Sequence, residues 1–327
     1  MRAAMCTEYR PPGLLQVVDV PAMTAADGQV VVDISHAAVN YPDVLVIANR
    51  YQISVPLPFV PGSEFAGVVS AVGQGVETVA VGDRVFGAAM TGAYAEQITV
   101  PEPAVRKVPD GVGLDVVAGF WVAHATAYYA IRSIAEVVRG ERVVVLGAAG
   151  GVGLAAVELA ALLGARVIAT ASTEEKLALC VQRGAEDTVN YGRDDLRGAL
   201  RALAPAGVDV VLDPVGGPLA EQALRALGWR GRFVTIGFAS GEIPRIPLNL
   251  VLLKGCVIKG FEIRTFGQFE PALAKRDERE LLEMLADGRV APHVSAIHDL
   301  DHVADALGQV AGRSSIGKVL ITLRTPM

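Results

Sequence analysis

The sequence predicts an α/β protein in which a domain built on a parallel sheet is inserted into a β-rich domain. Its 327 residues are enough for about two domains. Short β-branched runs separated by turn signals fill the first third of the chain. From about residue 140 to residue 260, strand-length apolar runs alternate with helical patterns, which is typical of βαβ units. The tail ends in a strand-like run, so we expect the C-terminus to return to the first domain.

In the first domain, turns such as Asp27-Gly28 and Pro61-Gly62 separate the expected strands. This spacing favours a compact barrel or sandwich over a helical bundle. The expected strands cover residues 30–34, 67–72, 84–86 and 97–100.

In the inserted domain, helices should cover both faces of a parallel sheet, because each expected strand leads into a helix or a crossover. We expect strands at residues 143–146, 167–170, 188–191, 208–212, 232–236 and 256–260, and helices at 152–163, 174–183, 195–203 and 219–227. Two helices at 278–287 and 300–310 and a strand at 318–323 complete the tail.

The composition excludes several classes of protein. A hydrophobic fraction of 52% with 20% charged residues is too apolar for intrinsic disorder. The net charge of −6, without a basic stripe, argues against nucleic-acid binding. Three widely separated cysteines provide neither a disulfide scaffold nor a thiolate zinc site.

One stretch, residues 143–165, is apolar enough to span a bilayer and carries a single charge, Glu158. Four glycines within seven positions make a membrane helix the weaker interpretation, since buried parallel strands are also continuously apolar. The N-terminal region has no apolar run of signal-peptide length. We therefore expect a cytoplasmic protein that does not interact with membranes.

The segment after the strand at 143–146 matches a dinucleotide-binding loop. Ala148, Gly150 and Gly153 occupy the three glycine positions of GxGxxG, with Gly151 and Val152 between the last two. Small residues there let a backbone approach a pyrophosphate and let the helix pack on the strand. The helix N-terminus would offer amides and a positive dipole end to phosphates. The alternative is a glycine turn with only a structural role.

The end of the next strand bears on which nicotinamide cofactor binds. An NAD enzyme usually has an acidic residue there, but this chain has Ala171 and Ser172. Ser172 and Lys176 could instead hold the 2′-phosphate of NADPH. The alternative is an ordinary helix cap and a solvated lysine, because Ser172 or Thr173 before Glu175 resembles a capping box. We expect NADPH.

Several motifs in order resemble the medium-chain dehydrogenase/reductase superfamily, above all its zinc-free quinone oxidoreductase (zeta-crystallin-like) branch. They lie at residues 40–51, 61–67, 81–85, 148–153 and 314–319 and so extend along the whole chain. The resemblance implies a doubly wound Rossmann cofactor-binding domain at residues 121–261. It also implies a GroES-like partial-barrel catalytic domain formed by residues 1–120 and 262–327.

Zinc-dependent members of that superfamily carry a cysteine ligand within residues 38–41 and a histidine in a Gly-His-Glu triplet. This chain has no cysteine there, and its triplet is Gly62-Ser63-Glu64. Catalytic zinc needs about three protein ligands, so we expect no metal. Without a Lewis acid, alcohol oxidation is difficult, whereas hydride addition to a quinone or a conjugated carbonyl compound remains possible.

The resemblance also implies site residues, each of which has a structural alternative. Asn40 would face the nicotinamide and substrate, or form an Asx turn before Asp43, a possible helix cap. Thr126, which we expect to open a helix, would contact the nicotinamide or bond only its own backbone. Tyr51 would donate a proton, or pack against Pro56 and Pro58.

Further positions concern the cofactor and the assembly. Tyr191 would lie on the adenine side or be a sheet-edge aromatic, and Phe238 would wall the cofactor groove. Arg313 and Lys318 would approach the cofactor or be isolated surface bases. The apolar run 255–260 should form a sheet edge, and we expect it to pair in a homodimer.

The leading hypothesis is a zinc-independent, NADPH-dependent oxidoreductase that reduces quinones or α,β-unsaturated carbonyl compounds, with a small molecule as its partner. The enzymatic alternative is an enoyl-thioester (acyl-CoA) reductase. The other alternative is a crystallin-like protein that binds NADPH without turnover, although Asn40, Tyr51 and Thr126 would then have no catalytic purpose.

Overall fold

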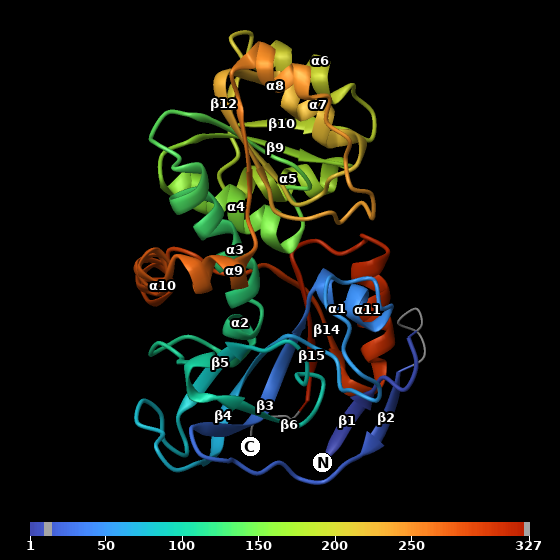
Figure 1. Cartoon of the computed structure of the whole chain (residues 1–327), viewed down its shortest axis with the longest axis vertical. Helices are drawn as coiled ribbons and strands as arrows, with labels where there is room; N and C mark the ends of the chain where they lie inside the picture. The colour runs from blue at the N-terminus through green and yellow to red at the C-terminus, as the bar shows by residue number, and fades with distance from the viewer. Residues whose placement is uncertain (10–14, 324–327) are drawn as a thin grey trace. The chain divides into compact units, whose positions relative to one another are not determined.

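The computed structural model of the chain describes residues 1–9 and 15–323 (Figure 1). The chain forms two compact units. Unit 1 contains Met1–Val122 and Ala291–Met327, and unit 2 contains Ala123–Val290. The first unit is therefore discontinuous in sequence and the second is inserted into it.

Unit 2 is built on a six-stranded sheet with the strand order β10-β9-β8-β11-β12-β13, and every neighbouring pair is parallel. The order reverses between β8 and β11, as in the doubly wound Rossmann fold. The strands are β8 (Arg142–Val145), β9 (Arg166–Ala171), β10 (Asp187–Asn190), β11 (Val208–Asp213), β12 (Leu227–Thr235) and β13 (Val257–Gly260).

Helices cover both faces of this sheet, with α4 and α5 on one side in Figure 1 and α6, α7 and α8 on the other. The sheet carries uninterrupted buried runs such as Val143 to Leu146 because both of its faces are covered. The helices are α3 (Trp121–Tyr129), a π-helix at Ala130–Ala135, α4 (Gly151–Leu162), α5 (Glu174–Gln182), α6 (Leu196–Leu203), α7 (Pro218–Ala226), α8 (Leu248–Lys254), α9 (Ile263–Phe269) and α10 (Pro271–Ala286). These bounds confirm all six strands and four helices predicted for the insert.

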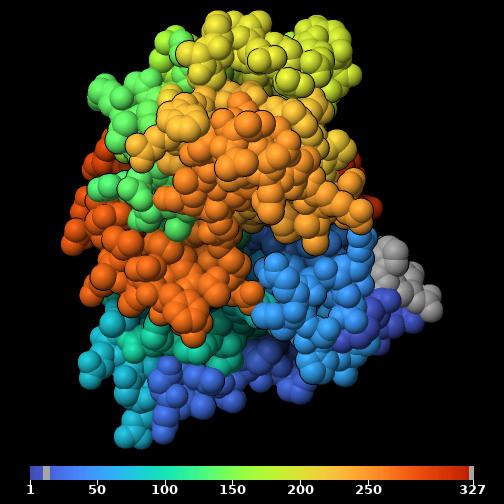
Figure 2. Space-filling model, turned by 45° about the horizontal axis from the view of Figure 1, so that its top comes forward, coloured from blue at the N-terminus to red at the C-terminus, as the bar shows by residue number. Residues whose placement is uncertain are grey.

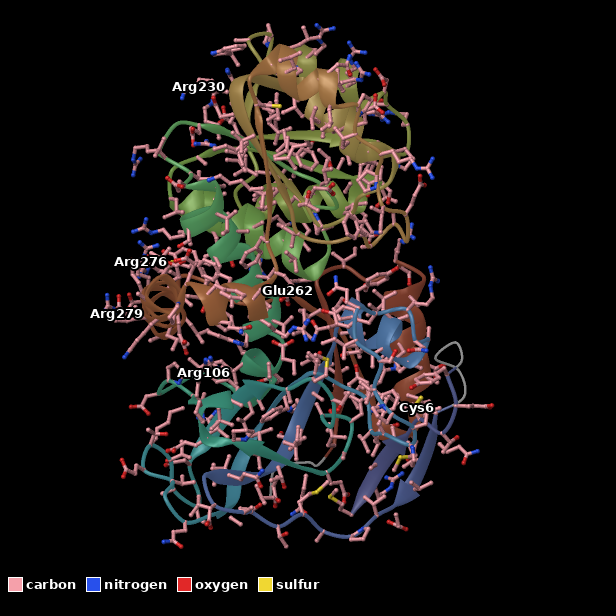
Figure 3. All side chains as sticks on the ribbon, in the orientation of Figure 1. Cys6, Arg106, Arg230, Glu262, Arg276 and Arg279 are labelled. Atoms are coloured by element: carbon pink, nitrogen blue, oxygen red, sulfur yellow. The ribbon has the colours of Figure 1, made fainter. Side chains whose placement is uncertain are left out.

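Residues 262–290 belong to unit 2, whereas the sequence interpretation assigned them to the first domain. Polar contacts join α10 to the π-helix. Glu280 accepts hydrogen bonds from the hydroxyl of Tyr128 at 2.6 Å and from Arg132 at 3.1 Å. The fully buried Asp277 pairs with Arg276, which is labelled in Figure 3. The contacts of Glu280 with Tyr128 and Arg132, and of Asp277 with the Ser133 hydroxyl, join residues 144 to 152 positions apart. They keep α10 on unit 2 and left no local signal in the sequence.

Unit 1 contains a seven-stranded, largely antiparallel sheet with the order β14-β15-β3-β4-β5-β7, and β6 pairs with β3. A separate pair, β1 and β2, lies beside it. The strands are β1 (Arg2–Met5), β2 (Gln16–Asp19), β3 (Gln29–Val39), β4 (Glu64–Val72), β5 (Arg84–Ala88), β6 (Gln97–Pro101), β7 (Val105–Lys107), β14 (Val294–Asp299) and β15 (Lys318–Thr322). Its α-helices are α1 (Tyr41–Ile47), α2 (Leu114–Ala118) and α11 (Val303–Ala311), with short 3-10 turns at Glu102–Ala104 and Leu300–His302.

The β-rich first domain is confirmed, but β3 is longer than the predicted 30–34 segment. It runs for 11 residues and pairs with β4, β6 and β15, which hides polar residues such as Ser35 within the sheet. Tight backbone contact explains one glycine: a Cβ at Gly67 would lie 2.0 Å from the carbonyl oxygen of Asp33. Helix α2 and strands β1, β2, β7 and β14 were not predicted, and α1 was foreseen only as the helix that Asp43 would cap.

Within the part of the chain that the structure describes, no helix is long and apolar enough to cross a membrane. The apolar stretch at residues 143–165 is divided among β8, a glycine-rich turn and α4. The segment is continuously apolar because a buried strand and a buried helix follow each other closely, although neither spans it alone.

One surface of unit 2 is strongly apolar, and we call it the apolar edge face. It is formed by β12, α8 and the edge strand β13, and Figure 2 shows the α8 and β13 segment (orange) facing the viewer. Leu252 on α8 is 79% exposed and Trp229 on β12 is 73% exposed. The face comprises Trp229, Leu248, Leu252, Leu253, Val257 and Ile258. Exposed apolar groups of this number mark an interaction surface.

A buried carboxylate, that of Asp43, lies in the first turn of helix α1. Asp43 accepts hydrogen bonds from the backbone N–H of Asn40 and from the hydroxyl of Tyr94, both at 2.8 Å. Tyr94 can approach because residue 62 is glycine: a Cβ there would lie 2.4 Å from the tyrosine ring. Burial raises the pKa of Asp43 to about 6, although hydrogen bonds from Ser63, Asn40 and Tyr94 and the charge of Lys318 act in the opposite direction.

The raised pKa of Asp43 predicts a pH-dependent stability of unit 1. The folded state binds the proton more tightly than the unfolded state, so the stabilisation is full below the usual pKa of 3.8 and is lost as the pH rises through about 6. A shift of about two pKa units corresponds to about 3 kcal/mol. Asp43→Asn should therefore gain stability relative to the unsubstituted chain between pH 4 and pH 7 by about that amount.

The measurement is urea unfolding followed by tryptophan fluorescence in a Trp229→Phe background, in which Trp121 reports on unit 1. Parallel pH profiles with and without Asp43→Asn would contradict this account of the carboxylate.

Candidate functional site

The N-terminus of α4 lies at the carboxyl ends of the parallel strands, next to the point where the strand order reverses. Gly150 is the N-cap residue and has no side chain with which to cap the first helical amides. The turn before it is tied to the sheet, because the N–H of Ala148 donates to the carbonyl oxygen of Thr170 at 2.9 Å. The amides of Gly151 and Val152 in the first turn, half-buried, are thus available to an anion.

Glycine is found at positions 150 and 153 of this loop for different physical reasons. A Cβ at Gly153 would lie 2.3 Å from the carbonyl oxygen of Gly147, so helix packing alone requires glycine there. A Cβ at Gly150 would meet only that same oxygen, at an ordinary 3.5 Å. The packing of the chain therefore does not require glycine at position 150, whereas a closely approaching pyrophosphate would. The loop fits a dinucleotide.

Ala148 differs from the other loop residues, since it is fully buried and its N–H is already bonded to Thr170. Ala148 therefore contributes to the turn from its buried side. Any contact of Ala148 with a cofactor would have to be indirect.

The carboxyl end of β9 has no acidic residue. Ala171 is buried as the last residue of the strand, and Ser172 is half-buried beyond it. Thr173, not Ser172, is the N-cap of α5: its hydroxyl accepts the N–H of Lys176 at 3.3 Å. The capping role is therefore taken by another residue, and the Ser172 side chain is not needed for it.

The end of β10 contributes a second polar group to this region. Tyr191 directly follows the strand and is half-buried. Glu174 of α5 accepts a hydrogen bond from the Asn190 amide at 2.8 Å and lies 3.2 Å from Arg193. This bridge ties α5 to the end of β10. It places the Arg193 guanidinium, 70% exposed, close to Glu174; sequence reasoning did not single out this arginine.

The turn after β11 completes the strand-end region. One carboxylate oxygen of Asp213 accepts the N–H groups of Val215 and Gly216 at 2.8 and 2.7 Å. Among the residues that the structure describes, the other oxygen is buried without a hydrogen-bond partner, and burial raises the pKa of this group. Phe238, which follows β12, packs its ring near Gly216, where a Cβ would lie 2.8 Å from the ring.

Thr126 does not open a helix as predicted. It is buried in the second half of α3, which begins at Trp121. The apolar residues before it left no start signal in the sequence, so the beginning of the helix was misplaced. Its suggested contact with a nicotinamide stays a prediction.

Unit 1 contains a buried polar cluster, which we define as Asn40, Asp43, Ser63, Glu64, Tyr94 and Lys318. The Lys318 ammonium donates to Asn40 Oδ1 at 2.5 Å and to Glu64 Oε2 at 3.0 Å. Asn40 Nδ2 donates to the same Glu64 oxygen at 3.1 Å and faces Ser63 Oγ at 3.4 Å. Lys318 is therefore neither an exposed base nor an isolated one. The Asn40 side chain is held by charged neighbours, and Asn40 is also the N-cap of α1, where the Asp43 carboxylate accepts its backbone N–H in a capping box.

Tyr51 lies beyond α1 and is half-buried against the apolar core of unit 1, which also receives Val55 and Leu57. Pro56 and Pro58, its suggested packing partners, are exposed. The structure thus places Asn40 within the buried polar cluster, whereas Tyr51 packs against the apolar core of unit 1.

The buried polar cluster does not fit a zinc ion. Residues 38–41 contain no cysteine, the triplet 62–64 has Ser63 and no histidine, and the amide and hydroxyl oxygens of Asn40 and Ser63 are poor zinc ligands. The Lys318 ammonium already lies on the oxygens of Asn40 and Glu64 and would repel a divalent cation. Within residues 1–9 and 15–323, no group of three or more His, Cys, Asp or Glu side chains could hold a metal ion.

Sequence reasoning missed the role of Glu64, Tyr94 and Lys318. Glu64 and Lys318 belong to the quoted motifs, so the motifs marked their positions without revealing that they pair. Their partnership spans 254 residues and becomes visible only when β4 and β15 flank β3.

Comparison with known proteins agrees with this architecture. Residues 26–110 match the family model described as the alcohol dehydrogenase GroES-like domain, and residues 151–278 match the one described as zinc-binding dehydrogenase. The chain is 38% identical over 325 residues to mouse quinone oxidoreductase-like protein 2, covering 99% of this chain and 92% of that protein.

Solved structures agree as well. A mycobacterial protein in complex with NADPH is similar with a TM-score of 0.92 and 32% identity, over 98% of this chain and 99% of the other. The Escherichia coli quinone oxidoreductase in complex with NADPH has a TM-score of 0.92 and 26% identity, over 98% and 100%. The chain therefore belongs to the quinone oxidoreductase branch of the medium-chain dehydrogenase/reductase superfamily, and it is an oxidoreductase.

Proposed function

We propose that this protein is a zinc-independent reductase that uses NADPH to reduce quinones or α,β-unsaturated carbonyl compounds. The observation that carries the proposal is the combination of an uncapped α4 N-terminus with a β9 end that has no acidic residue. The similarity to two proteins solved with NADPH supports the same cofactor.

Each part of the strand-end region would bind one part of the dinucleotide. The amides of Gly151 and Val152 would hold the pyrophosphate, with space at Gly150 for its approach. Ser172 and Lys176 would bind the 2′-phosphate, Tyr191 would contact the adenine side, and Phe238 would form a wall. Arg193, near the end of β10, already pairs with Glu174 and Asp194, so we assign it no cofactor contact.

When bound, NADPH supplies a hydride. The chain must then orient an electrophile and stabilise the negative charge that develops on its oxygen. Asn40 would donate a hydrogen bond to that oxygen, and Thr126 would fix the nicotinamide. Tyr51 would donate the proton that an enolate requires, since a phenol is a suitable acid for an enolate but a poor base at neutral pH.

The zinc-free part of the proposal rests on the donor set of the buried polar cluster. Alcohol oxidation benefits from a Lewis acid that lowers the hydroxyl pKa, and the oxygens in this cluster are instead paired with an ammonium. Electrophiles that already accept electrons, such as quinones and enones, do not need this activation. An enoyl-thioester reductase is the second candidate, because the same chemistry applies to a conjugated thioester.

The proposal and the role of Tyr51 are tested in one assay of NADPH oxidation against quinones, enones and enoyl-CoA compounds. The unsubstituted protein should reduce at least one of these classes. Tyr51→Phe should lower kcat by about 10²–10⁴ for enones or enoyl thioesters, with cofactor affinity unchanged. With quinones it should be nearly normal, because water can protonate a stable phenolate.

Tyr9→Phe is the matched control, since Tyr9 packs on the same core and its hydroxyl donates to the Val55 carbonyl oxygen at 2.6 Å. Absence of turnover with every class would contradict the proposed function. Full activity of Tyr51→Phe on every class would remove the tyrosine from the mechanism.

Lys176→Ala tests the cofactor preference. If the ammonium binds the 2′-phosphate, the substitution should weaken NADPH binding by about 1.5–3 kcal/mol and leave NADH binding nearly unchanged. The measurement is a fluorescence titration with each dinucleotide. Lys275→Ala on α10, an exposed lysine of the same unit, should affect neither. Equal losses for both cofactors would mean that Lys176 does not contact the phosphate.

We also propose that the apolar edge face forms a homodimer. The edge strand β13 has one unpaired side, and edges of this kind are normally covered. The leucines of α8 and the indole of Trp229 are exposed, and the indole lies beside Gly255 at the end of α8. Pairing of two copies would bury both the edge and these side chains. The contacts would be the same from both copies, as a two-fold axis requires.

Light scattering should therefore give a mass twice the 34.2 kDa of the chain at micromolar concentration. Leu252→Glu should shift the protein to the monomer, because it places a charge in an apolar interface. Val138→Glu changes an exposed apolar residue elsewhere in unit 2 and should leave the mass unchanged. A monomeric unsubstituted protein would rule out the assembly.

A further inference from the structure

Lys318, the first residue of β15, is an unusual lysine because its side chain is only 4% exposed. Lysine is almost never buried unless its charge is paired. Here the ammonium has two acceptors, Asn40 Oδ1 at 2.5 Å and Glu64 Oε2 at 3.0 Å. Its backbone N–H donates to the carbonyl oxygen of His293 at 2.8 Å, which fixes the start of the strand.

Strand pairing brings these three residues together. Val319 of β15 pairs with Val39 of β3, next to Asn40, and Glu64 of β4 pairs with Ala38 of β3. The side chains therefore converge at one end of three neighbouring strands. Rigid strands hold a functional group more accurately than loops do.

The two charged neighbours determine the orientation of the Asn40 amide. Oδ1 accepts from the ammonium, and Nδ2 donates to the carboxylate of Glu64 at 3.1 Å. A flipped amide would place its NH₂ group against the ammonium and its oxygen against the carboxylate, giving two repulsive contacts. The second Nδ2 hydrogen faces only Ser63 Oγ, at a long 3.4 Å.

The charges of Glu64 and Lys318 balance each other, so loss of either residue should disturb this arrangement. Glu64 is fully buried, and its other oxygen accepts the N–H of Val122 at 2.8 Å. Loss of the lysine would leave a buried carboxylate without a counterion, which is costly. Asp43 and Tyr94 belong to the same cluster. Asp43 accepts from the Asn40 backbone N–H and the Tyr94 hydroxyl, and it also interacts with Ser63 and with the charge of Lys318.

We propose that Lys318 is a positioning residue for the reduction proposed above, on which this inference rests. Its ammonium, together with Glu64, holds Asn40 so that an Nδ2 hydrogen is directed to the substrate. The residue therefore selects substrates that present an acceptor, such as a carbonyl oxygen. The ammonium provides the fixed positive charge in a cluster that does not fit zinc.

The experiment compares Lys318→Met, Asn40→Ala and the double variant in steady-state reduction of a conjugated ketone and in NADPH titrations. Lys318→Met should lower kcat/KM for the ketone by roughly 10²-fold, while cofactor affinity remains within about twofold. Lys318→Met should cause no further loss in the Asn40→Ala background, because both substitutions remove one interaction. Lys107→Met, which removes the exposed Lys107–Asp83 pair on the same sheet, should leave kcat/KM unchanged.

A charge-neutral variant separates positioning from stability. Glu64→Gln with Lys318→Met removes both charges and should recover the thermal midpoint lost in Lys318→Met, but not the activity. It also replaces Lys318→Met in every assay if the single variant does not fold. If the charge-neutral variant recovers activity together with stability, Lys318 only neutralises Glu64. If the losses in kcat/KM of Lys318→Met and Asn40→Ala multiply in the double variant, Lys318 acts independently of the Asn40 amide.

A spectroscopic measurement distinguishes this inference from the proposed function, because it requires no turnover. The chain has four asparagines, so ¹⁵N labelling of asparagine with Asn40→Ala as reference identifies the Asn40 side chain by NMR. Its NH₂ signals should exchange slowly with solvent in the unsubstituted protein and rapidly in Lys318→Met or in the charge-neutral variant. Slow exchange without any reductase activity would overturn only the proposed function. Equal exchange in all variants would overturn the positioning role.

Discussion

The structure of unit 1 depends on the buried ion pair between Glu64 and Lys318. It joins β4 near the beginning of the unit to β15 near its end, and both flank β3. Ion pairs on a protein surface contribute little, but removing one partner of a buried pair leaves a charge that water cannot reach. The pair also determines what the neighbouring amide can do, since Asn40 accepts from one member and donates to the other. A structural constraint and a chemical property thus arise from the same two residues.

In the glycine loop of unit 2, the reason for glycine differs from one position to the next. Gly153 is needed because a helix and a strand approach each other closely, and this requirement exists whether or not a ligand binds. Gly150 has no such requirement from the chain, so its glycine is explained by what approaches from outside. The fully buried Thr170 braces the same turn from β9 through the Ala148 amide. This hydrogen bond holds the turn against β9 without a ligand, which favours pre-organised binding.

Most of the Rossmann unit could be predicted from the sequence, because buried parallel strands and their helices leave strong local patterns. The six strands and the sheet-edge position of β13 were predicted from runs such as Val143–Val145, and the loop followed from its glycines. Failures had other causes. Residues 262–290 are held by Asp277 and Glu280 contacts with partners far away in sequence, and no local pattern records them. Thr126 was misplaced because the first turn of α3 is bonded by Glu64, which is distant in sequence, and the neighbouring residues give no local start signal. Of the two residues that the sequence offered as the cap of α5, Ser172 and Thr173, the structure selects Thr173. Lys318 was visible as a residue, but its role depends on strand pairing.

The insertion of one unit into the other has a consequence for biosynthesis. Unit 2 is continuous, so it can begin to fold while the chain is still being made. Unit 1 cannot be completed at that stage, because β14, α11 and β15 are synthesised after the insert. Until β15 leaves the ribosome, the Glu64 carboxylate has no lysine and residues 36–39 of β3 lack a neighbour on one side. The nascent chain therefore carries an incomplete sheet with an open strand edge through the synthesis of the whole insert, and this interval is when it most needs protection from aggregation.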